Sequence, residues 1–259
     1  MTSDRKKQLA SLDKLLTIMD ELREKCPWDQ KQTFESLRHL TIEETYELGD
    51  AILDKNLEGI KGELGDLLLH IIFYSKIASE THDFDISDVA EAISKKLVFR
   101  HPHVYGDVSV ADEEAVKKNW EKLKLKEGKK SVFEGVPKSL PALVKASRIQ
   151  DKAAGVGFDW KDIKDVKTKL DEELDELHSE VMSGSFDRQE AEFGDVLFSM
   201  INYARFLGIN AEDALERTNK KFLKRFRFME NEVHSKGKSI DELSLEEMEA
   251  LWQQSKITD

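Results

Sequence analysis

Hydrophobic side chains recur every three or four positions over much of this sequence, which is the spacing of one face of an α-helix. Near the start of the chain this face consists of Leu9, Leu12, Leu15, Leu16 and Met19. A second face runs from Ile42 to Ile52, and a broader one spans 64–75. β-Branched residues occur singly and polar and apolar positions do not alternate, so strands are not expected. The pattern predicts an all-α fold.

Proline and glycine indicate where these helices are interrupted. Three of the four prolines fall at 102, 137 and 141, and none follows. We therefore predict a helical domain over 1–100, a linker over 101–141 with one short helix at 112–126, and a second helical domain over 142–259. The Gly155–Gly157 segment predicts a further break inside the second domain.

An internal repeat is the most informative feature of the sequence. Two acidic segments of the first half, 43–47 and 63–68, have counterparts at 172–176 and 192–197. Each matched acidic residue lies 129 positions after its counterpart, so the two segments keep their separation. Two copies of one helical unit are the simplest explanation.

The repeated acids have the spacing of a metal site. Glu44 and Glu47 are three residues apart, so they share a helix face, and Glu63 and Asp66 repeat this spacing on the next helix. Four facing carboxylates repel one another unless a cation lies between them. All-oxygen ligands favour Mg²⁺, with Mn²⁺ as a substitute. The second half repeats the set as Glu173, Glu176, Glu192 and Asp195.

These acids have two other interpretations. In a chain with a net charge of −12, acidic helix faces are often only solvated surface. Asp66 and Asp195, however, directly precede strongly apolar stretches, where an acid without a ligand is unfavourable. A di-iron carboxylate protein would carry Glu three positions before His, and none of the seven histidines has one. Hydrolysis assisted by a divalent cation is therefore favoured over redox chemistry.

Charge and composition narrow the class of protein further. The acidic balance argues against a nucleic-acid-binding surface. A single cysteine, Cys26, excludes an internal disulfide, and no apolar stretch reaches the ~20 residues of a membrane helix. The N-terminus shows no signal-peptide pattern, so a cytoplasmic protein that does not contact membranes is expected. A basic cluster over 220–227 places Lys221 and Arg225 on one helix face, where they could bind phosphate.

The motifs together resemble the MazG family of nucleoside triphosphate pyrophosphohydrolases, which belongs to the all-α NTP-pyrophosphatase superfamily. The resemblance extends over nearly the whole chain in the same order. The segments that carry it, besides the two acidic sets, are 26–30 (CPWDQ), 101–106 (HPHVYG), 119–121 (NWE), 140–143 (LPAL) and 156–160 (VGFDW).

The resemblance implies two tandem helical bundles, a homodimer, and Mg²⁺-dependent hydrolysis of NTPs and dNTPs to the monophosphate and pyrophosphate. It implies that the second acidic set ligates the metal, with Glu172 beside it as a further catalytic carboxylate. Phosphate contacts would come from Lys169, Arg188, Lys221 and Arg225, and Trp252 would pack near the base. Ala191 departs from the family pattern, in which relatives often carry Glu.

Three functions remain open at this point. The first is a MazG-type enzyme with broad base tolerance; the second is a narrower house-cleaning enzyme such as a dUTPase or dCTPase; the third is a non-enzymatic helical adaptor. Within the first, we expect the C-terminal half to carry most of the hydrolysis. The basic cluster and Trp252 belong to that half, whereas Pro102 ends the corresponding helix of the first half.

Overall fold

The computed structural model describes residues 2–108, 116, 123 and 131–257 of the 259-residue chain. Every regular element in the described residues is helical, as the periodicity predicts. Contacts divide the chain into two compact units, Met1–Val110 and Ala111–Asp259. The short helix expected over 112–126, with Trp120, lies outside the described residues apart from 116 and 123. No helix in the described ranges is both long and apolar enough to cross a bilayer.

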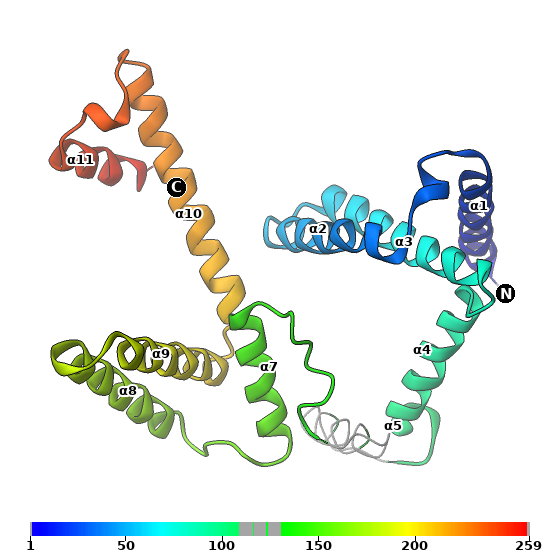
Figure 1. Cartoon of the computed structure of the whole chain (residues 1–259), viewed down its shortest axis with the longest axis horizontal. Helices are drawn as coiled ribbons and strands as arrows, with labels where there is room; N and C mark the ends of the chain where they lie inside the picture. Colours follow the sequence, from blue (N-terminus) through cyan, green and yellow to red (C-terminus); the bar gives the residue numbers. More distant parts are fainter. Residues whose placement is uncertain (1, 109–115, 117–122, 124–130, 258–259) are drawn as a thin grey trace. The chain divides into compact units, whose positions relative to one another are not determined.

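The first unit is built around a pair of antiparallel helices, α2 (Phe34–Leu53) and α3 (Leu57–Glu80), which lie side by side (Figure 1). A three-residue turn joins them and includes Lys55 at φ 55°. The helices α1 (Ser3–Lys25), α4 (Ile86–Arg100) and α5 (Pro102–Tyr105), with the 3₁₀ turn η1 (Asp29–Lys31), complete the unit.

The core of this unit lies where α1, α2 and α3 meet. Its buried side chains are Met19, Leu37, Ile72 and Phe73. At the edge of this core, Arg23 pairs with Glu80 at 2.7 Å and donates a hydrogen bond to the Gln32 carbonyl at 3.1 Å. These bonds tie the loop that contains the CPWDQ segment to α1 and α3.

The second unit contains a corresponding antiparallel pair, α8 (Ile163–Ser183) and α9 (Phe186–Phe206). α7 (Ala142–Gly155) packs against α9 and α10 (Ala211–His234), as Figure 1 shows. At its C-terminal end α10 packs against α11 (Leu245–Ser255) and the 3₁₀ turn η2 (Ile240–Glu242). Met229, Val233 and Leu251 form the buried cluster of this end.

Two of the predicted boundaries coincide with real helix ends. Pro102 is the first residue of α5, where its missing N–H group costs nothing, and α4 ends at Arg100. α7 ends at Gly155, and Gly157 follows at φ 91°, a conformation that only glycine adopts without strain. The domain boundaries 1–100, 101–141 and 142–259 stay a prediction.

The second unit leaves many large apolar side chains exposed. They include Phe193, Phe198 and Met200 on α9 and Phe222 and Leu223 on α10. Exposed apolar patches on folded units are typical of interaction surfaces.

Candidate functional site

The paired helices of each unit position the acidic residues. In the first unit Glu44 and Glu47 stand one turn apart on α2, and Glu63 and Asp66 stand one turn apart on α3. Asn56 caps α3 by accepting a hydrogen bond from the Gly59 N–H at 3.0 Å, which fixes where α3 begins. α8 and α9 hold the counterparts in the second unit.

Three of the four acids converge in the first unit. One carboxylate oxygen from each of Glu44, Glu63 and Asp66 lies within 4.8 Å of the other two. Burial raises the pKa of Glu44, with further contributions from the charges of Asp66 and Glu47 and from a hydrogen bond with Glu63. Carboxylates held so close together repel one another, and a divalent cation would relieve that repulsion.

Three acids also converge in the second unit, but they are not the same three. Glu173, Glu176 and Glu192 bring their oxygens within 4.8 Å of one another. Burial raises the pKa of Glu192, and the charges of Glu176, Asp195 and Glu173 raise it further. This donor set fits a hard divalent cation, because each group is an anionic oxygen ligand.

The structure thus brings together six of the eight predicted ligands. Glu47 in the first unit and Asp195 in the second are exposed and lie outside the three-acid groups. Each nevertheless acts electrostatically on its own group, because its charge raises the pKa of Glu44 or Glu192. The assignment of four ligands in each half stays a prediction.

Lys169 contacts the second cluster directly. Its ammonium Nζ lies 2.9 Å from Glu173 Oε1 and 3.3 Å from Glu172 Oε2. These hydrogen bonds raise the pKa of Lys169, so it stays charged at neutral pH. The Glu172 side chain is exposed and does not belong to the three-acid group.

Arg188 lies at the start of α9 and pairs with Glu180, at 3.9 Å between Nη1 and Oε1. The equivalent position in the first unit is Gly59, where an added Cβ would lie 2.7 Å from the capping Asn56 side chain. In the second unit the cap is Ser185, whose side chain makes no capping bond. The smaller cap leaves room for a side chain at 188.

Sequence reasoning missed Glu180. It lies one turn beyond Glu176 on α8, and its charge contributes to the raised pKa of Glu192. Its Oε2 is buried without a hydrogen-bond partner among the described residues. The i, i+4 spacing from Glu176 was the available signal; the first repeat has Ala51 at the equivalent position.

The other predicted phosphate and base contacts belong to α10 and α11. The Arg225 guanidinium lies 5.7 Å from the centre of the Trp252 ring, and the Phe222 ring lies 5.1 Å from it. α10, which also carries Lys221, packs mainly against α7, α9, η2 and α11. Lys221, Arg225 and Trp252 therefore belong to the α10–α11 pair, whereas the carboxylates belong to α8–α9. That these two groups of residues form one site stays a prediction.

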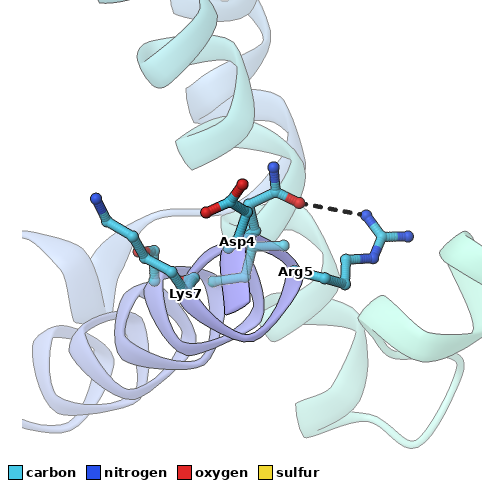
Figure 2. Close-up of a pocket in the computed structure, with 6 residues that line it drawn as sticks. Asp4, Arg5 and Lys7 are labelled. Atoms are coloured by element: carbon cyan, nitrogen blue, oxygen red, sulfur yellow. Dashed lines mark hydrogen bonds between the residues drawn. The ribbon is translucent and has the colours of Figure 1, made fainter. Parts of the chain in front are cut away.

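One hollow, of about 670 Å³, is lined by residues that are distant in sequence from all of these. It is a shallow surface along the first turns of α1, where Asp4 and Lys7 extend into solvent and Arg5 reaches Gln8 at 3.5 Å (Figure 2). Its lining comes from one helix and includes none of the clustered acids, so we do not associate it with the chemistry.

The geometry can be compared with known proteins. The sequence model described as the MazG nucleotide pyrophosphohydrolase domain matches residues 32–105 and 162–227, one stretch in each unit. The chain belongs to the MazG family. Each matched stretch contains one complete acidic set, so family membership and the two carboxylate clusters concern the same helices.

Full-length relatives of the MazG family agree. The nucleoside triphosphate pyrophosphohydrolase of Escherichia coli K12 is 44% identical over 254 residues, which is 95% of this chain and 97% of the relative. The nucleoside triphosphate pyrophosphohydrolase/pyrophosphatase MazG of Thermotoga maritima is 43% identical over 249 residues, which is 94% of this chain and 95% of the relative.

Among solved structures, a MazG-related protein from Thermotoga maritima is 26% identical to this chain, with a TM-score of 0.39. The match covers 44% of this chain and 98% of the solved chain.

These findings confirm the predicted all-α class, the MazG resemblance and the enzyme class of nucleoside triphosphate pyrophosphohydrolases. They exclude the non-enzymatic adaptor as the best interpretation. The acidic clusters could hold a metal ion, as the repeat predicts.

Proposed function

We propose that this chain hydrolyses NTPs and dNTPs to monophosphate and pyrophosphate with broad base tolerance, using Mg²⁺ or, as a substitute, Mn²⁺. The observation that carries the proposal is the convergence of Glu173, Glu176 and Glu192 within a segment that matches the MazG domain. The names of the two full-length relatives describe the same reaction class.

The residues of the second unit suggest how the work is divided. Glu173, Glu176, Glu192 and Asp195 would hold the cation, whose charge would offset that of the triphosphate and acidify a bound water. Glu172 lies beside Glu173 on the exposed side of α8, where its carboxylate could accept a proton from the attacking water. Lys169, next to both, is a donor for phosphate oxygens.

We place most of the activity in the second half, because three charged side chains stand at its cluster and are replaced in the first. Positions 129 residues earlier carry Leu40 in place of Lys169, Gly59 in place of Arg188 and Ala51 in place of Glu180. The first cluster therefore has acids but lacks these neighbouring cations. Arg100, the counterpart of Arg225, is buried in the last turn of α4.

We further propose that the enzyme acts as a cytoplasmic homodimer. Phe193 and Met200 on α9 and Phe222 on α10 are each more than half exposed in the single chain. A second copy would cover such faces by symmetry. The surface of the second copy could then lie beside Lys221 and Arg225 of α10 and contribute to nucleotide binding.

The test is hydrolysis of all eight common nucleoside triphosphates, with separate detection of pyrophosphate and phosphate. We expect pyrophosphate from several bases, and complete loss of turnover after chelation that added Mg²⁺ reverses. Release of single phosphate, or activity that survives exhaustive chelation, would contradict the proposed reaction. Turnover of one nucleotide alone would indicate a dUTPase-like or dCTPase-like enzyme instead.

A further inference from the structure

Lys169 neutralises the least exposed acid of the second cluster. Glu173 keeps only 10% of its side chain exposed, whereas Lys169 is 39% exposed and reaches it from the rim of the site. A buried carboxylate is costly without a partner, so this ion pair satisfies Glu173. Glu173 is, however, also one of the three acids that converge as candidate metal ligands.

The first cluster has no such lysine. Leu40 stands at the position equivalent to Lys169. There the structure pairs two acids with each other, because the Glu44 carboxyl hydrogen-bonds to Glu63. Among described residues, no Lys or Arg forms an ion pair with the Glu44, Glu63 and Asp66 group. The lysine counter-charge is thus a feature of the second half only.

We propose that Lys169 is an exchangeable counter-ion, which pairs with Glu173 until a divalent cation takes its place and which then turns to the phosphates of the nucleotide. The inference rests on the proposed function and adds an order of binding to it. In the second half, binding of the cation then precedes binding of the nucleotide and promotes it. The first half lacks this coupling, because Leu40 occupies the position of Lys169.

Charge explains why the two cations exclude each other at Glu173. A hard divalent cation binds carboxylate oxygen at about 2.0–2.1 Å, well inside the 2.9 Å that separates the ammonium from the same carboxylate. Two positive groups at one carboxylate repel each other strongly, and this repulsion favours departure of the ammonium from Glu173. The lysine side chain is long and partly exposed, and it can therefore move by rotation without disturbing α8.

Metal binding without nucleotide is the direct test. The variant Lys169→Met keeps the length of the side chain and removes its charge, and Mn²⁺ titration by electron paramagnetic resonance measures the affinity. Glu44→Gln and Glu63→Gln together, as a common background, silence the first cluster. We expect roughly fivefold tighter Mn²⁺ binding, the scale of a partly exposed ion pair that no longer competes.

The chain supplies a matched control on the same helix. Lys167 also forms an i, i+4 ion pair, with Asp171, which is not a member of the cluster. Lys167→Met therefore changes the net charge by the same amount and should leave Mn²⁺ affinity near that of the background. Lys169→Arg keeps the positive charge and should also stay near it. Circular dichroism verifies that each variant is folded.

A second measurement separates counter-ion exchange from a structural role. With cation present, Lys169→Met should bind a non-hydrolysable dNTP analogue more weakly, because a phosphate partner is lost. Tighter binding of the cation together with weaker binding of the nucleotide analogue in Lys169→Met supports the proposal. Unchanged or weaker Mn²⁺ binding in Lys169→Met overturns it while leaving the proposed hydrolysis intact. If Glu173→Gln binds Mn²⁺ normally, both the exchange and the proposed metal site are wrong.

Discussion

Two variants distinguish which half performs the hydrolysis. They are Glu173→Gln in the second cluster and Glu44→Gln in the first. Each substitution keeps the shape of the side chain and removes one negative charge from a group of three acids. The two positions are equivalent in the repeat, although only Glu173 also pairs with a lysine, Lys169.

The geometry sets the size of the effect. At the 4.8 Å limit between carboxylate oxygens, two unit charges interact by about 3.5 kcal/mol at an effective dielectric constant of 20. That figure is the repulsion between two acids; a cation between them lies closer to each oxygen and is attracted by at least as much. Loss of one ligand charge removes that attraction, offset by the repulsion that it relieves and by solvent screening at Glu176 and Glu192. We expect Glu173→Gln to lower kcat/KM by roughly 100-fold at subsaturating Mg²⁺, or about 2.7 kcal/mol. Glu44→Gln should keep most of the activity.

The assay measures pyrophosphate release from one dNTP over a series of Mg²⁺ concentrations. A lost ligand weakens cation binding, so high Mg²⁺ should restore part of the activity of Glu173→Gln. Thermal unfolding in chelator checks that both variants are folded. Equal losses in the two variants would mean that both halves work, and a larger loss from Glu44→Gln would reverse the assignment.

Three further predictions concern stability and assembly. Arg23 holds the pKa of Glu80 below its usual 4.5 through a hydrogen bond, so this carboxylate stabilises the fold above pH 4.5 and the contribution disappears as the pH falls through the lowered pKa. Glu80→Gln should therefore lower the free energy of unfolding by at most about 1 kcal/mol at pH 7, and should leave it unchanged at acid pH. Urea unfolding of the variant and the wild type over a range of pH measures this difference. Leu37 is 1% exposed in the first core, so Leu37→Ala should lower the free energy of unfolding by about 2–5 kcal/mol, whereas the exposed Leu57→Ala should change it little. Light scattering should return about twice the chain mass of 29.8 kDa, and a value near the single-chain mass would refute the dimer.

Helix positions followed from the sequence because their signals are local. Apolar spacing identified the helices, and Pro102 and Gly155 marked ends that the structure reproduces. The constant repeat offset correctly paired α2–α3 with α8–α9. Each of these inferences depends on residues within a turn or two of one another, or on one segment resembling another.

Convergence of side chains was only partly predictable. Periodicity assigns Glu47 and Asp195 to the cluster-facing side of their helices, yet both remain exposed outside the three-acid groups. A face on a helix spans about a third of its circumference, and the rotation of each helix against its neighbour decides which residue of a pair points inward. That rotation depends on core packing across the pair, which no motif encodes.

The differences between the two repeats indicate function more sharply than their similarities do. The shared acids give each half a cluster, so they cannot distinguish a working site from a silent one. Lys169 and Arg188 can, because cations beside an acidic cluster serve a ligand that carries its own negative charge, as a triphosphate does. A side chain at position 59 would have its Cβ 2.7 Å from the Asn56 cap and would have to displace it, so this position favours glycine for a reason unrelated to catalysis. Leu40 packs against the first core, so a lysine at that position would lose apolar contacts that Lys169 on α8 does not replace. In the first half these positions lie at the helix cap and the core, and in the second we propose that they serve the substrate.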